Sequence, residues 1–182
     1  NAPTETAKAE AAFRIGDLYL ERRQHALALA AYFNAYKYFN DEAVRFPEVA
    51  LNRAESLYWL GQHSRAETEF RKYLENHGQD PDSWRARWRM AELVGRTGPR
   101  GKSDAYRNYL LETVNTHPFS TAAKLARLLL MSCGDHAGFN KESMDLFVRK
   151  ELEISSEDPV IFWDRLPSLV LLAKARALAS FD

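Results

Sequence analysis

Residues 50–74 read ALNRAESLYWLGQHSRAETEFRKYL and contain the clearest helical pattern of the chain. In its first half, Ala50, Ala54 and Leu57 recur three or four residues apart, the spacing that places side chains on one face of an α-helix. Gly61 interrupts the pattern, and a second helical run then carries its apolar residues on one stripe, at Ala66, Phe70, Tyr73 and Leu74. Two short amphipathic helices joined by a glycine turn form a helical hairpin, which cannot bury its apolar stripes alone. The sequence therefore predicts neighbouring hairpins of the same kind.

The pattern recurs on both sides of this stretch. Three residues stand 38 positions before Ala54, Ala66 and Phe70, namely Gly16, Ala28 and Tyr32. On the C-terminal side, Ala91 stands 37 positions after Ala54, and Ala105 and Tyr109 stand 39 positions after Ala66 and Phe70. A weaker fourth copy is formed by Ala126, Gly134, Ser143 and Phe147. Since a small residue lets two helix backbones approach and an aromatic residue four positions later fills the adjacent space, the copies predict similar packing.

Helices are expected at residues 6–22, 25–42, 47–60, 63–76, 82–96, 103–115, 119–132 and 140–153. Thr6 offers a start signal for the first helix because a hydroxyl can accept a hydrogen bond from a free N–H group there. The prolines fall between units or open the next helix, at Pro47, Pro81, Pro118 and Pro159. Together these features predict an all-α fold.

This array resembles the tetratricopeptide repeat family, whose repeat is about 34 residues long. The repeats span approximately residues 9–42, 47–78, 82–116 and 119–153, and C-terminal helices follow at 158–181. The resemblance implies a right-handed superhelix of helix-turn-helix units in one domain, 1–182, with C-terminal capping helices. The prolines in Phe46-Pro47-Glu48 and His117-Pro118-Phe119 are similar to those of bacterial cell-envelope members, which favours a periplasmic or envelope-associated location over a cytoplasmic one.

Composition excludes several classes of function. The chain has 182 residues, of which 25 are Lys or Arg and 25 are Asp or Glu, and this balance argues against general nucleic-acid binding. Its apolar runs are too short for a membrane span, so membrane insertion is not expected. The single cysteine, Cys133, excludes an internal disulfide and follows an apolar run, as a buried inert thiol does.

No motif for catalysis, a metal or a cofactor is recognisable. The segment RTGPRGKS at 96–103 resembles a phosphate-binding loop but has Arg96 where the first glycine is required, so an enlarged turn is expected. The five histidines show neither the i, i+4 pair nor the HExxH spacing of a zinc site. The sequence thus predicts a protein without catalytic residues or cofactors.

Alignment of the first helices indicates a polar row. The position two before the small residue is occupied by Arg14, Asn52, Arg89 and Lys124, and the position after it by Asp17, Glu55, Glu92 and Arg127. The resemblance implies that these positions face a concave groove, where Phe13, Tyr58, Trp59 and Trp88 would add aromatic surface. Aromatic rings beside arginine and asparagine suit an extended peptide, so these residues form the predicted partner-binding site. The alternative is that Arg14, Asp17, Glu55, Arg89 and Glu92 pair between adjacent helices as solvated salt bridges.

The functional expectation is a non-catalytic scaffold that binds a peptide or partner protein, in a bacterial multi-protein assembly. A regulatory or docking segment of a larger enzyme or signalling protein is the alternative. A third reading is RNA or phosphate-ligand binding at Arg96, Arg100, Lys102 and Arg107. Residues 160–181 are strongly apolar, which predicts self-association, a partner contact or a following repeat there.

Overall fold

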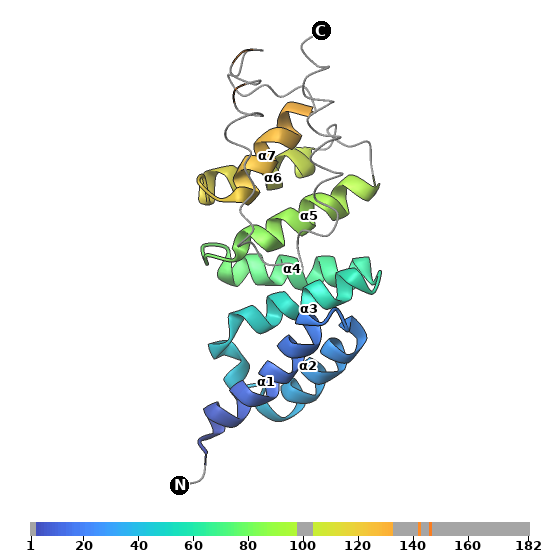
Figure 1. Cartoon of the computed structure of the whole chain (residues 1–182), viewed down its shortest axis with the longest axis vertical. Coiled ribbons are helices and arrows are strands. Elements are labelled where there is room, and N and C mark those ends of the chain that lie inside the picture. The colour runs from blue at the N-terminus through green and yellow to red at the C-terminus, as the bar shows by residue number, and fades with distance from the viewer. Residues whose placement is uncertain (1–2, 98–103, 133–141, 143–145, 147–182) are drawn as a thin grey trace. The chain divides into compact units, whose positions relative to one another are not determined.

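The computed structural model describes residues 3–97 and 104–132 together with the single positions 142 and 146. In these ranges the chain forms α-helices, one 3-10 helix and no strand (Figure 1). Their order is α1 (Glu5–Glu21), α2 (His25–Phe39), η1 (Glu42–Arg45), α3 (Pro47–Trp59), α4 (His63–His77), α5 (Ser83–Thr97), α6 (Asp104–Thr116) and α7 (Thr121–Ser132). The all-α prediction is confirmed for this part of the chain.

Helix starts follow local chemistry. The Oγ1 of Thr4 accepts a hydrogen bond of 3.2 Å from the backbone N–H of Ala7, so Thr4 caps α1. The expected cap, Thr6, is wrong, because its hydroxyl instead donates a 2.9 Å hydrogen bond to Glu42 of η1. Pro47 opens α3 at the first helical turn, where its missing N–H leaves no hydrogen bond unmade.

Two hairpin turns use the left-handed backbone conformation. Gly61, between α3 and α4, has φ of 74°, as the turn prediction required. Arg23, which stands 38 positions earlier between α1 and α2, has φ of 59°. The first turn therefore has the same left-handed backbone conformation, although Arg23 carries a Cβ atom that disfavours it.

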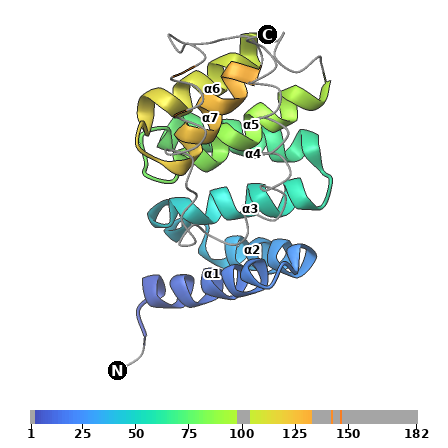
Figure 2. The ribbon, with the colours of Figure 1, turned by 45° about the horizontal axis from the view of Figure 1, so that its top comes forward.

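The chain divides into two compact units, Asn1–Ala86 and Arg87–Asp182. In the first unit, α1 pairs with α2 and α3 pairs with α4, and both helices of the first pair contact α3 (Figure 2). Gly16 lies where α1 meets the fully buried ring of Tyr32 on α2. A Cβ at this glycine would lie 2.2 Å from Cε1 of that ring, so only glycine permits this approach.

Aromatic and charged side chains join the two hairpins of the first unit. The buried ring of Phe13 packs on Tyr36 and Phe46, with ring centroids 5.4 and 5.7 Å away. The guanidinium of Arg53 lies 4.6 Å from the ring centroid of Tyr36 and forms an ion pair with Glu69. These contacts join α1 to α2 and join α3 to both α2 and α4.

The second unit corrects one part of the repeat alignment. Ala105 is exposed and Tyr109 is half-buried, whereas Tyr106 and Leu110 are buried with Ala91 and complete their cluster with Ala126 and Leu130. The core positions of α6 thus fall 40 residues after Ala66 and Phe70, one more than predicted. Burial is set by the helix phase, and a turn of altered length shifts that phase by one residue.

Several predictions fall outside the described residues. These are Cys133 and Gly134, Ser143 and Phe147 of the fourth repeat, the basic turn Arg100 and Lys102, and the helices at 158–181; only positions 142 and 146 are described in the helix expected at 140–153. The right-handed superhelix and the single continuous domain stay predictions.

Candidate functional site

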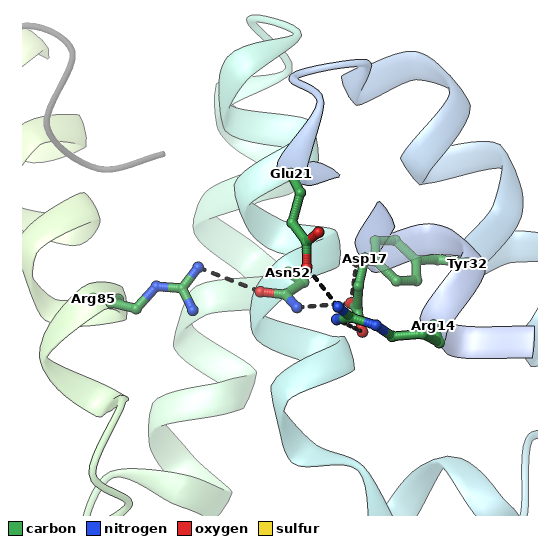
Figure 3. A network of polar contacts seen from close by, with 6 residues as sticks. All are labelled: Arg14, Asp17, Glu21, Tyr32, Asn52 and Arg85. Carbon is green, nitrogen blue, oxygen red and sulfur yellow. Dashed lines mark hydrogen bonds and ion pairs between the residues drawn. The ribbon is translucent and has the colours of Figure 1, made fainter. Parts of the chain in front are cut away.

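A network of polar side chains connects four helices of the first unit, and Asp17 of α1 is its centre (Figure 3). The Oδ1 of Asp17 accepts hydrogen bonds from the hydroxyl of Tyr32 on α2, at 2.7 Å, and from Nδ2 of Asn52 on α3, at 3.0 Å. The Oδ1 of Asn52 accepts a bond of 3.3 Å from Arg85, in the first turn of α5. The network therefore links the first helices of three successive hairpins.

Arg14 gives this network its solvent-exposed charge. Its Nη1 lies 3.6 Å from Oδ2 of Asp17, and its Nη2 lies 2.8 Å from Oε1 of Glu21. The three residues are three or four positions apart on α1, so they share one side of the helix. The side chain of Arg14 is 57% exposed and that of Asp17 is 18% exposed. The guanidinium is thus held in place by two carboxylates while still reaching solvent.

The position of Asp17 follows from the packing of its neighbours. Gly16 allows the ring of Tyr32 to lie against α1, and the phenol oxygen then reaches the carboxylate of the next residue. Burial, followed by the hydrogen bond to Asp17 and the negative charge of that carboxylate, raises the pKa of Tyr32 well above its usual value. Tyr32 therefore remains a neutral hydrogen-bond donor to Asp17 at physiological pH.

Asn52 has hydrogen-bonding capacity beyond its two network bonds. A side-chain amide carries two N–H donors and two acceptor lone pairs, and Asn52 gives one donor to Asp17 and one lone pair to Arg85. These two neighbours fix which end of the amide is oxygen and which is nitrogen. The amide also forms a hydrogen bond with the phenol oxygen of Tyr32, so Asn52 can offer one further acceptor, in a fixed orientation.

Other predicted site residues of the first unit lie in the core. Phe13, Glu55 and Tyr58 are buried, so their side chains do not reach a partner in this conformation. Trp59 is half-buried and stacks on His25, with ring centroids 5.8 Å apart. Helix α3 is packed on more sides than an amphipathic helix with one buried stripe, because it contacts α1, α2 and α4. The aromatic surface predicted beside the polar row is consequently smaller than expected.

The second unit holds the remaining predicted residues. Trp88 and Arg89 are buried, and Nη1 of Arg89 donates to Oε2 of Glu92 at 2.6 Å. Lys124 is partly buried, and Nη1 of Arg127 donates to the backbone oxygen of Pro118 at 3.0 Å. Arg89 thus contacts a residue of its own helix, and Arg127 of α7 contacts the segment that precedes this helix.

Two ion pairs among the residues of the salt-bridge alternative lie within a single helix. Arg14 and Asp17 pair within α1, and Arg89 and Glu92 pair within α5, each three positions apart. Contacts between helices are made instead by Arg53 with Glu69 and by Arg87 with Glu112, at positions that the sequence did not single out.

Sequence reasoning also missed three members of the network. Arg85 lies four positions before Arg89 and therefore on the same side of α5, so helical spacing could have identified it. Glu21 lies four positions after Asp17 in the same way. Tyr32 was assigned to the core for its ring, and only the structure shows where its hydroxyl points.

Side-chain geometry, helix composition and comparison with known proteins bear on other kinds of function. Among the described residues, no three His, Cys, Asp or Glu side chains lie close enough to hold a metal ion. No helix in those ranges combines the length and apolarity needed to cross a bilayer. Neither the models of known protein families nor the sequences of curated proteins match this chain.

Proposed function

We propose that this chain is a non-catalytic interaction scaffold of tetratricopeptide-like hairpins, and that it binds an extended peptide segment of a partner protein. The binding surface is the side of α1, α3 and the first turn of α5 that carries Arg14, Asp17, Asn52 and Arg85. The observation that carries the proposal is the fixed, partly solvent-exposed row of polar groups that this network creates.

The chemistry of the row fits a peptide ligand. An extended peptide presents backbone N–H and C=O groups along its length, and each needs a partner when it leaves water. Asn52 can accept one further hydrogen bond from a peptide N–H, and Arg14 can donate to a carbonyl or carboxylate oxygen. Since Asp17 and Glu21 already orient the guanidinium, a ligand needs to immobilise less of this side chain on binding.

The proposal is tested with a randomised peptide library displayed on phage, followed by calorimetric titration of enriched peptides. We expect Arg14→Ala to weaken binding by about tenfold or more, which corresponds to about 1.4 kcal/mol. Asn52→Ala should give a similar loss. Thermal unfolding of both variants shows whether they remain folded.

Arg71→Ala is the matched control. Arg71 of α4 is 59% exposed, against 57% for Arg14, and pairs with Glu67 at 2.6 Å on the same helix. The two substitutions therefore remove the same charge from equally exposed, ion-paired sites. Affinity that falls equally in both variants, or in neither, would contradict the proposed surface.

A further inference from the structure

The surface that carries the polar network is more acidic than the chain as a whole, which has 25 basic and 25 acidic residues. On α1, Glu10, Arg14, Asp17 and Glu21 are spaced by three or four positions and therefore share one side of the helix. All four side chains reach solvent, although Asp17 does so only in part. This side of α1 thus presents three carboxylates and one guanidinium group.

A further carboxylate lies one helical turn before the network residue on each of three helices. On α3, Glu48 precedes Asn52 by four positions, as Glu10 precedes Arg14 on α1. Since Glu10 and Glu48 are 38 positions apart, they occupy the same place in successive hairpins.

Asp82 is the corresponding carboxylate beside Arg85. The backbone oxygen of Asp82 accepts a 3.0 Å hydrogen bond from the backbone N–H of Arg85, so the two residues lie in the same turn at the start of α5. We call Glu10, Glu48 and Asp82 the acidic row. All three side chains are exposed, and in the described part of the chain none of them forms an ion pair.

The cations closest to the acidic row along the chain already have partners. The guanidinium groups of Arg14 and Arg85 are held within the network. Arg45, three residues before Glu48, pairs with Glu42 at 3.3 Å. The negative charge of the acidic row is therefore left for a ligand to neutralise.

The pKa of Tyr73 on α4 responds to the negative charge at one end of this row. Tyr73 is buried, and its burial is the largest cause that raises this pKa to about 12. The charges of Asp80, Asp82 and Glu48 act in the same direction, and the charge of Arg85 opposes them. Carboxylates from the start of α3 and from the segment before α5 thus lie near one phenol, and they outnumber the cation there.

We propose, as an inference that rests on the peptide-binding function, that the bound segment is basic and that its lysine or arginine side chains pair with the acidic row. A surface with an excess of carboxylates attracts a cationic segment and repels an anionic one. The remaining acceptor of the Asn52 amide also suits an N–H donor. The whole surface carries five carboxylates and two guanidinium groups, at Glu10, Asp17, Glu21, Glu48 and Asp82 and at Arg14 and Arg85.

Arg14 keeps its part in binding such a segment. Its guanidinium lies between two carboxylates and can still donate to a backbone carbonyl oxygen of the peptide. In an extended chain every second side chain points to the same side, so cationic side chains can reach the exposed carboxylates one turn away. The backbone and the side chains of the peptide therefore contact different residues of one surface.

Selection from a randomised phage library against the 182-residue chain tests the class of ligand. We expect the enriched peptides to contain more Lys and Arg than Asp and Glu. Their dissociation constants should rise between about 0.05 and 0.5 M salt, because salt screens interactions between exposed charges.

A triple variant, Glu10→Gln with Glu48→Gln and Asp82→Asn, removes the charge of the acidic row and keeps the size of its side chains. It should raise the dissociation constant of an enriched peptide by about 10-fold or more, since each exposed ion pair contributes up to about fivefold. Glu75→Gln is the matched control and should leave the constant unchanged. Glu75 of α4 is also exposed and, within the described residues, has no ion-pair partner.

Two outcomes would overturn the basic ligand and leave the peptide-binding function intact. One is a set of enriched peptides that lose affinity in Arg14→Ala but are acidic or uncharged. The other is a set of basic peptides whose affinity the triple variant does not reduce. A library that yields no binding peptide would instead contradict both the function and the ligand class. Circular dichroism of each variant confirms that the helices are intact.

Discussion

Gly16→Ala is the substitution whose effect the structure defines most sharply. The added methyl carbon would lie 2.2 Å from Cε1, 2.5 Å from Cδ1 and 2.8 Å from Cζ of Tyr32, whereas carbon atoms in contact prefer roughly 3.5–4.0 Å. The ring is fully buried, so it can move only by displacing its neighbours. Its hydroxyl would then leave Asp17, with which it now forms a 2.7 Å hydrogen bond.

Opposing effects decide the magnitude. Overpacking a core costs about 1–3 kcal/mol. Loss of a hydrogen bond to a charged group costs roughly 1.5–3 kcal/mol. Alanine is better than glycine inside a helix by about 1 kcal/mol, which offsets part of this. We expect Gly16→Ala to lower the free energy of unfolding by about 2–4 kcal/mol. Each kcal/mol lost should lower the melting temperature by about 2–4 °C.

Denaturant unfolding of a double-mutant cycle with Tyr32→Leu tests this reasoning. Without the ring the clash is absent, so Gly16→Ala should stabilise the Tyr32→Leu protein by up to about 1 kcal/mol through helix propensity alone. The effect of the same methyl group therefore changes sign. If Gly16→Ala is neutral or stabilising in the wild-type background, the close approach of α1 to Tyr32 is not as described.

Two further predictions concern the core of the first unit. Ala28→Leu and Ala66→Leu, at fully buried positions, should each lower the free energy of unfolding by about 1–3 kcal/mol. Glu67→Ala, at an exposed surface ion pair, should change it by less than about 1 kcal/mol. Equal melting temperatures for Ala66→Leu and Glu67→Ala would contradict the repeat packing. Burial raises the pKa of Tyr32 above its usual value and that of Tyr73 to about 12, so the folded state holds both protons more tightly than the unfolded chain. The stabilisation from these two groups is then complete below about pH 10, the ordinary tyrosine pKa, and is lost as pH rises above it. Urea unfolding at increasing pH should show this fall in the free energy of unfolding, and Tyr32→Phe should reduce the fall.

Helix positions were largely readable from the sequence, whereas the site was readable only in part. Apolar spacing and Gly61 located the hairpins because both are local properties of a helix and its turn. The repeat offset aligned Arg14, Asp17 and Asn52, and in the structure Asp17 contacts both of the others. Which neighbours each of them contacts was not predictable from spacing.

The repeat alignment fails where the number of residues between successive repeats changes. In the first two hairpins the offset of 38 residues is constant, and Gly16, Ala28 and Tyr32 match Ala54, Ala66 and Phe70 in burial. After the segment at 98–103 the offset changes by one, and the alignment then selected Ala105 and Tyr109 instead of Tyr106 and Leu110. A shift of one residue turns a side chain by about 100°, enough to exchange a buried position for an exposed one.

For the described residues, local sequence patterns were enough to predict the helices, their turns and the small residues at their crossings, because each depends on residues a few positions apart. Packing between helices, by contrast, is what buries Phe13 and Glu55, lets Tyr32 donate to Asp17 and leaves Ile15 and Leu27 exposed. A helix presents several sides to its surroundings, and its sequence does not state which of them a neighbour covers. That assignment depends on contacts between residues 15 to 36 positions apart, such as Tyr32 with Asp17 and Thr6 with Glu42, and these exist only once the helices have packed.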